Sequence, residues 1–284
     1  MQLRKGKSLI RSALFPLFAP TGSTHADFAG ERVQGKSGLG DYGDFVLMVD
    51  AMVGRVLQAV KESGEDENTI VVFTTDNGCS PAAGIKELIA QGHHPSSIFR
   101  GHKADLFDGG HRVPCIMRWP GGAKPHRVDQ TVCLTDFYAT FAALNGYTLN
   151  DTEGEDSYNL LPAIASEAEV APIREATVHH SIAGQFTIRQ GEWKLLLSPS
   201  SGGWSAPKLN DSTALASLPP VQLYNMKTDP SEQKNVEAQH PGKVAELRSL
   251  LVKYVEEGRS TPGKPQKNDG DYPWKQLNDV FIKK

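Results

Sequence analysis

Apolar residues between positions 44 and 63 recur at the spacing of one helical face, which predicts an amphipathic helix. The residues on this face are Phe45, Val46, Met48, Val49, Met52, Val53, Val56, Leu57 and Val60. A continuous β-branched and aromatic run at 69–75 then predicts a strand that is buried on both faces. Because alternating helices and strands favour a parallel sheet, we expect 69–75 to be a central strand with the helix packed on one face.

Shorter patterns of the same kind follow. Apolar spacing predicts helices at Ile85–Ala90 and Asp136–Leu144, and Thr135 is a candidate N-cap for the second of them. Val113–Arg118 is expected to be another strand, ended by a Pro-Gly-Gly turn at 120–122.

The second half of the chain has a different pattern. Short alternating segments predict strands at Thr177–Ser181, Gln185–Arg189, Trp193–Leu197 and Val221–Tyr224. An amphipathic helix is expected after Pro241. Together these segments predict a small antiparallel sheet with a closing helix. The aromatic side chains Phe186, Trp193 and Trp204 are expected in its core rather than on a sugar-binding surface.

These patterns divide the chain into four parts. Residues 1–30 are a divergent start, 31–165 an α/β part, 166–260 a small C-terminal subdomain and 261–284 a polar surface tail. The start combines a basic segment with a short, proline-containing apolar stretch, so it matches a signal peptide only loosely.

Composition narrows the possible functions. The formal net charge of −3 gives no general case for nucleic-acid binding, and no run approaches the roughly 18–20 apolar residues of a membrane span. Cys79, Cys115 and Cys133 show neither a disulfide framework nor a zinc-site spacing, so we expect free and mostly buried thiols.

The strongest chemical signal is Thr75-Asp76-Asn77-Gly78, at the end of the predicted strand. In open α/β sheets ligands bind outside the carboxyl ends of strands, so Asp76 and Asn77 are placed to hold a hard metal ion or an anion. Taken alone, the same residues are also typical turn formers.

Further along, Lys103 precedes the stretch Asp108-Gly109-Gly110-His111-Arg112-Val113-Pro114. Other characteristic stretches are Gln34-Gly35-Lys36-Ser37-Gly38-Leu39-Gly40, Arg118-Trp119-Pro120-Gly121, Leu134-Thr135-Asp136 and Gly191-Glu192-Trp193-Lys194-Leu195. With the Asp-Asn-Gly stretch they resemble the arylsulfatase-like sulfatases of the alkaline-phosphatase-like fold. The resemblance runs from about Val33 to about Gly263.

The resemblance implies a site and a reaction. Asp76 and Asn77 resemble the last two ligands of a divalent-cation site, usually calcium, and Lys103 resembles the lysine that contacts the sulfate group. His102 stands beside that lysine and is a candidate catalytic residue. We therefore expect these four residues to converge on one cleft, where the ester of a sulfated small molecule or glycan is hydrolysed.

Two further histidines follow from the same resemblance. The C-terminal subdomain of the family helps to close the cleft, and His180 is the member of the His179–His180 pair expected to contact substrate, since adjacent strand residues face opposite ways. His25 resembles a remnant of the histidine that assists the leaving group. Family members are usually exported to the periplasm, the lysosome or the outside of the cell.

The chain also departs from the family. The nucleophile, a Cys/Ser-x-Pro-x-Arg residue converted to formylglycine, is absent, because Cys79-Ser80-Pro81-Ala82-Ala83 has alanine where arginine is required. Two further metal-ligating aspartates of the family's N-terminal half are also missing. We expect the chain to correspond to the C-terminal part of a sulfatase, to be inactive alone, and to bind calcium weakly. The missing N-terminal half is a candidate partner.

Three functions remain open. The first is part of a sulfuric ester hydrolase, and the second is a non-catalytic remnant or binding module that keeps the cleft floor. The third is a phosphoester or phosphonate hydrolase, because the fold alone does not separate sulfate from phosphate esters.

Overall fold

The computed structural model describes residues 33–122, 124–168, 170–270, 274 and 277. Its first part contains five helices and two strands: α1 (Gly40–Glu62), β1 (Val71–Thr74), α2 (Ile85–Ala90), α3 (Asp108–His111), β2 (Cys115–Arg118), α4 (Asp136–Leu144) and α5 (Leu161–Ile164). Single 3-10 turns lie at η1 (Asp66–Asn68) and η2 (Pro81–Ala83). The predicted helices and strands of this part are confirmed. Thr135 precedes α4 as expected, although its side chain makes no capping hydrogen bond.

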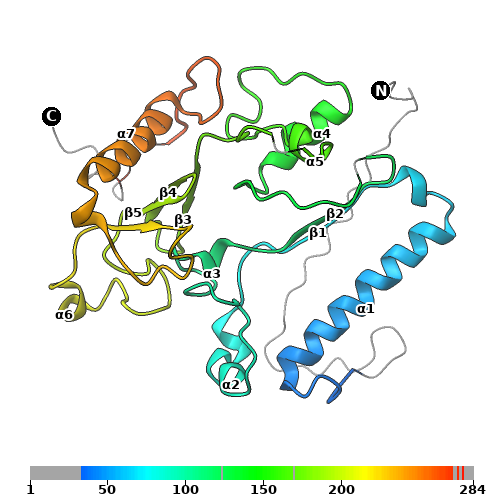
Figure 1. Ribbon diagram of the computed structural model, residues 1–284, viewed down its shortest axis with the longest axis horizontal. Helices are drawn as coiled ribbons and strands as arrows, with labels where there is room; N and C mark the ends of the chain where they lie inside the picture. The colour runs from blue at the N-terminus through cyan, green and yellow to red at the C-terminus, as the bar shows by residue number, and fades with distance from the viewer. Residues whose placement is uncertain (1–32, 123, 169, 271–273, 275–276, 278–284) are drawn as a thin grey trace.

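The pairing of β1 differs from the expected parallel arrangement. β1 pairs with β2 in an antiparallel ladder, with Val71 opposite Arg118 and Thr74 opposite Cys115, and these two strands form a sheet of their own within the described residues. The expected burial of β1 on both faces is also wrong among the described residues, because all four of its residues are only half-buried. An apolar run predicts a strand but not the direction of its partner, which depends on the connection. Here the chain passes through α2 and α3 and returns in the opposite sense (Figure 1).

The outer surfaces of α1 and β2 are open among the residues described. On α1, Val46 is 46% exposed and Val56 39% exposed, so the expected packing of the apolar helix face on a sheet is not seen there. On β2, Ile116 is 63% exposed and the Cys115 thiol is also exposed. All three cysteines are free, as predicted, but the expectation of mostly buried thiols is wrong, because Cys115 is exposed and Cys79 and Cys133 are half-buried. Periodicity in the sequence shows that one face of an element is apolar. Which segment packs on that face depends on residues far away in the sequence.

The C-terminal part is the predicted antiparallel sheet with a closing helix. Its elements are β3 (Thr177–His180), β4 (Phe186–Gln190), β5 (Trp193–Leu196), α6 (Ser212–Leu215), β6 (Gln222–Asn225), η3 (Glu237–Gln239) and α7 (Pro241–Glu257). The strands pair in chain order, β3-β4-β5-β6, and α7 covers one face of the sheet (Figure 1). The α/β class and this small antiparallel subdomain are therefore confirmed.

A hydrophobic core lies between this sheet and α7. Ile188, Leu195, Leu223 and Leu247 are 0% exposed, and burying each such side chain contributes about 1.5–3 kcal/mol. Phe186 and Trp193 pack against this core as predicted. Leu277 is also fully buried in it, so the tail is not confined to the surface.

No helix in the described part of the chain combines the length and the hydropathy that crossing a membrane requires.

Candidate active site

The loop after β1 lies directly against α3. The Gly78 amide donates to the Gly110 carbonyl oxygen at 3.0 Å, and the Lys103 amide donates to the Cys79 carbonyl oxygen at 2.9 Å. A Cβ at Gly78 would lie 1.8 Å from the Gly109 carbonyl oxygen, so only glycine permits this approach. Three conspicuous stretches of the sequence therefore meet through their backbones.

Asp76 and Asn77 lie at the open side of this junction. Asp76 is exposed, and its carboxylate makes no hydrogen bond or ion pair within the described residues. The Asn77 side-chain amide nitrogen donates to the Gly78 carbonyl oxygen at 3.1 Å, which leaves Oδ1 as an acceptor. Carboxylate and amide oxygens suit calcium, but calcium takes six to eight oxygens. The described residues contain no group of three or more His, Cys, Asp or Glu able to hold a metal ion. The oxygen atoms of Asp76 and Asn77 therefore suit calcium chemically, but they are too few to complete its coordination shell.

Lys103 is half-buried and leads into a constrained turn. The next residue, Ala104, has φ of 84°, a left-handed conformation that is uncommon for a residue other than glycine. Its carbonyl oxygen accepts a hydrogen bond from the Ile182 amide at 3.1 Å, and the Leu106 amide donates to the Ser201 carbonyl oxygen at 2.8 Å. Two loops of the C-terminal subdomain thus hold the backbone on either side of Asp105.

Asp105 fastens the same turn to the 200–205 loop. Its side chain is fully buried and accepts backbone hydrogen bonds from His102 at 2.9 Å, Trp204 at 2.9 Å and Ser205 at 3.0 Å. The Ser205 hydroxyl also donates to Asp105 Oδ2. We call this arrangement the Asp105 clamp, comprising the Asp105 carboxylate, the Ser205 hydroxyl and these three amides.

The His102 ring lies beside the clamp. Its Nδ1 lies 3.0 Å from the Lys103 carbonyl oxygen, and its Nε2 lies 3.3 Å from Ser205 Oγ. Both ring nitrogens therefore have partners within the protein. The structure places His102 in the framework around Lys103, and its predicted catalytic role stays a prediction.

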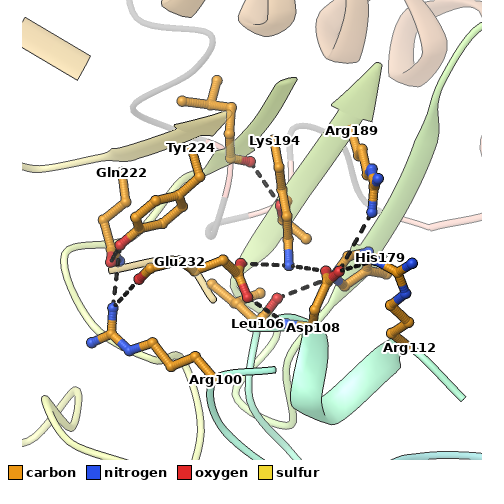
Figure 2. Close-up of polar contacts among 12 residues, drawn as sticks. Arg100, Leu106, Asp108, Arg112, His179, Arg189, Lys194, Gln222, Tyr224 and Glu232 are labelled. Atoms are coloured by element: carbon orange, nitrogen blue, oxygen red, sulfur yellow. Dashed lines mark hydrogen bonds and ion pairs between the residues drawn. The ribbon is translucent and has the colours of Figure 1, made fainter. Parts of the chain in front are cut away.

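A buried ion cluster connects α3 to the C-terminal sheet (Figure 2). Lys194 of β5 is 0% exposed, and its Nζ lies 2.7 Å from both Asp108 Oδ1 and Glu232 Oε1. The second Glu232 oxygen accepts the Asp108 amide at 2.6 Å. Arg189 and Arg112 reach Asp108 Oδ2 at 3.4 Å and 3.7 Å. Each carboxylate is thus paired, as buried charges must be.

Burial and the neighbouring positive charges change the pKa values of Asp108 and Glu232 in opposite directions. Burial disfavours ionisation of Asp108, but the Lys194 ammonium, with Arg189 and Arg112, outweighs it and lowers the pKa of Asp108. Burial raises the pKa of Glu232, in spite of the same ammonium.

The two adjacent histidines of β3 are placed differently. The His179 ring lies 3.9 Å from the His111 ring, and His179 Nε2 lies 3.2 Å from the Leu106 carbonyl oxygen. His180 is exposed, and its ring lies 5.9 Å from that of Phe186. It is His179, therefore, that the structure brings directly against the segment after Lys103. Contact of His180 with substrate stays a prediction.

His111 and His179, whose rings lie close together, are both held neutral. Burial, followed by the Lys194 ammonium, lowers the pKa of His111 to about 4. Burial and the neighbouring His111 hold the pKa of His179 well below its usual range. Nε2 of His111 is buried and has no hydrogen-bond partner in the part of the chain that is described.

The structure also bears on Arg112 and Trp204, but not on His25. His25, with all of 1–30, lies outside the described residues. Arg112 pairs with Asp108 and lies over the Phe99 ring at 4.5 Å, so it has a structural role here. Trp204 is 41% exposed, and its assignment to the core is wrong, because the Asp105 clamp holds it in a surface loop.

Sequence reasoning missed the clamp and the ion cluster. Lys194 gave a usable signal, since it is a lysine within an apolar strand. Asp105 and Glu232 gave none, because a single acidic residue in a loop is usually exposed.

Comparisons with known proteins identify the family. The Sulfatase family model matches residues 14–147. The chain is 32% identical over 226 residues to an N-acetylgalactosamine-6-O-sulfatase of Bacteroides thetaiotaomicron, covering 78% of this chain and 43% of that protein. It is 28% identical over 246 residues to human arylsulfatase A, covering 84% of this chain and 47% of that protein.

Solved structures agree. A sulfatase structure from work on glycosaminoglycan metabolism by Bacteroides thetaiotaomicron superposes with a TM-score of 0.67 at 32% identity, over 79% of this chain and 46% of that one. Another, in complex with its substrate D-glucosamine-2-N,6-O-disulfate, gives a TM-score of 0.51 at 26% identity, over 75% and 39%.

The chain spans about half the length of these curated relatives. The family match, the relatives and the superposed structures indicate the same family as the sequence motifs do. The chain belongs to the arylsulfatase-like sulfatase family and has the alkaline-phosphatase-like fold of that family.

Proposed function

We propose that this chain carries the calcium-binding strand end and the sulfate-contacting lysine of a sulfuric ester hydrolase. The observation that carries the proposal is the hydrogen bond from the Lys103 amide to the Cys79 carbonyl oxygen. It joins the backbone that bears Asp76 and Asn77 to the backbone that bears the lysine. Asp76 and Lys103 are far apart in the sequence, so it is the fold that brings their backbones together.

The chemistry of the three side chains supports the proposal. Asp76 and Asn77 would hold the cation, which supplies positive charge for the sulfuryl oxygens when it is bound. The Lys103 ammonium would attract the same oxygens from the side of the turn. Charged groups that are already in position stabilise the charge that develops in the transition state, because they need not reorganise. The Asp105 clamp holds the backbone of the Lys103 turn in this way.

We further propose that the chain alone does not turn over substrate. It contains no Cys/Ser-x-Pro-x-Arg sequence from which formylglycine could form. The nucleophile and the remaining calcium ligands would come from a segment that corresponds to the rest of the curated relatives, whether in the same polypeptide or supplied by a partner.

The substrate we propose is a sulfated carbohydrate. One relative is named as an N-acetylgalactosamine-6-O-sulfatase, and one similar structure holds a sulfated glucosamine as its substrate. Both names refer to hexosamines with sulfate at position 6, and we propose the same class of substrate for this chain.

Calorimetry with the full chain tests the metal site. We expect calcium to bind with an affinity near the millimolar end of known protein sites, since two side chains cannot fill its shell. Asp76→Ala should abolish this binding, whereas Asp50→Ala, which removes an exposed carboxylate of α1, should leave it unchanged. A micromolar site, or binding that survives Asp76→Ala, would contradict the assignment.

An assay with an aryl sulfate and calcium tests the chemistry. The chain alone should give no turnover above the uncatalysed rate. Turnover that persists in both Asp76→Ala and Cys79→Ala would show a different mechanism, and the proposed division of the active site would then be wrong.

A further inference from the structure

Trp204 stands out among the tryptophans because its side chain is 41% exposed beside the Lys103 turn. We propose that Trp204 is a sugar-stacking residue, which receives the ring of the carbohydrate whose sulfate group Lys103 contacts. This inference rests on the proposed function of Lys103. It assigns the recognition of the sugar to the C-terminal subdomain, separately from the recognition of the sulfate.

Within the described residues, the Trp204 ring makes no aromatic or cation–π contact and does not pack on the hydrophobic core of the subdomain. Trp193, in comparison, packs against the buried core of the subdomain and lies 4.9 Å from the His240 ring. A large aromatic side chain held in water costs free energy unless a ligand covers it. Pyranose rings present an apolar face of C–H groups, and a flat indole ring covers such a face with little loss of side-chain freedom.

The loop that carries Trp204 is fixed in place. The buried Asp105 carboxylate accepts the Trp204 amide at 2.9 Å, and the Ser201 hydroxyl accepts the Gly203 amide at 3.1 Å. A Cβ at Gly203 would lie 2.4 Å from the Ala104 carbonyl oxygen, so the loop backbone lies directly on the Lys103 turn. A ligand that stacks on Trp204 therefore meets a rigid surface and loses little free energy to loop ordering.

The same contacts fix the backbone of Trp204 relative to the backbone around Lys103. Asp105 is two residues from Lys103, and it also accepts the His102 amide on the other side of the lysine. One buried carboxylate thus holds the backbone amide of His102, next to the cationic Lys103, and the backbone amide of the exposed Trp204. A sulfated sugar offers matching groups for this pair, an anionic ester beside an apolar ring face.

Nuclear magnetic resonance of the full chain tests the proposal with two probes, inorganic sulfate and N-acetylgalactosamine 6-sulfate. The indole N–H signal of Trp204 is assigned from its loss in Trp204→Phe. We expect the sugar sulfate to shift this signal and inorganic sulfate to leave it in place. Trp204→Ala should weaken binding of the sugar sulfate about five- to tenfold without changing the affinity for inorganic sulfate.

Further variants complete the test. Trp204→Phe keeps an aromatic ring and should restore most of the affinity for the sugar sulfate. Leu209→Ala, which removes another exposed apolar side chain from the same region, should have no effect. Lys103→Met should weaken both probes.

The outcomes separate the two proposals. If Lys103→Met weakens both probes but Trp204→Ala changes neither, Trp204 is not a sugar-binding residue, and the proposed function stands. If Lys103→Met changes neither, or if the unmodified chain binds neither probe, the proposed role of Lys103 fails and this inference fails with it.

Discussion

Lys194 on β5 and Asp108 at the start of α3 form a buried ion pair, with Nζ 2.7 Å from Oδ1 (Figure 2). The pair ties the C-terminal sheet to the segment whose Gly110 carbonyl oxygen accepts the Gly78 amide. The loop that bears Asp76 and Asn77 is therefore connected to the C-terminal sheet through two polar contacts.

Removing this lysine should destabilise the chain strongly. Lys194→Met leaves the carboxylates of Asp108 and Glu232 buried without their shared cation, and we expect the free energy of unfolding to fall by about 3–5 kcal/mol. Urea denaturation measures this. Lys243→Met, which breaks an exposed pair with Glu246, should cost less than about 1 kcal/mol. Equal losses in the two variants would show that the buried cluster does not stabilise the fold.

The contact between the β1 loop and α3 should be intolerant of a side chain. In Gly78→Ala the new methyl group would meet the Gly109 carbonyl oxygen at 1.8 Å, so the two segments must separate. We expect a loss of at least about 1–3 kcal/mol in thermal or urea unfolding, together with a change in the Asn77 amide resonance. In contrast, Gly54→Ala in α1 has open space and should stabilise by about 0.5–1 kcal/mol. A neutral Gly78→Ala would contradict the close approach.

The neutral histidine pair should make stability depend on pH. The pKa of His111 is about 4 in the folded chain and 6.5 as its ordinary value. Between these values the unfolded chain binds more protons, so stability is complete above pH 6.5 and falls as the pH drops toward 4. At about 1.4 kcal/mol for each pKa unit, His111 contributes at most on the order of 3 kcal/mol to this change.

Urea unfolding at several pH values checks this dependence. His111→Asn should flatten the acid side of the stability profile. His126→Asn should not, because backbone carbonyl groups of Lys124 and Ala163 raise the pKa of His126, which gives a dependence of the opposite sign. An unchanged profile in His111→Asn would contradict the buried, neutral state of this ring.

The Asp105 clamp makes a separate prediction. Asp105→Asn replaces one accepting oxygen with an amide group that donates. This group would face the backbone amides of His102 or of Trp204 and Ser205, which also donate, and the change should cost about 1.5–3 kcal/mol. Asp211→Asn changes a carboxylate that caps α6 at the surface, where asparagine caps equally well, and should cost little. Hydrogen exchange of the Trp204 and Ser205 amides should accelerate in the first variant alone. Unchanged exchange there would contradict the clamp.

Local sequence was sufficient for most elements and insufficient for their assembly. The boundaries of α2 and α4 and the four antiparallel strands of the C-terminal sheet follow from periodicity and turn residues, which act over short distances. The antiparallel pairing of β1 with β2 depends on contacts between residues far apart in the chain, and no local pattern encodes it.

In the candidate site, too, some residues could be predicted from the sequence and others could not. Asp76, Asn77 and Lys103 lie in distinctive motifs, so sequence indicated them. Asp105 and Lys194 act through partners about a hundred residues away, and only the folded chain shows what they bind.

We propose that Asp76, Asn77 and Lys103 belong to one site, and a paramagnetic ion in place of calcium would reveal whether they do. With the lysine amines labelled by ¹³C-methylation and the Lys103 signal assigned from Lys103→Met, manganese(II) is titrated into the full chain. We predict that the Lys103 signal broadens first, ahead of remote lysines such as Lys243, and that Asp76→Ala abolishes this selective broadening. Equal broadening of Lys103 and Lys243 with manganese bound, or selective broadening that survives Asp76→Ala, would contradict the account.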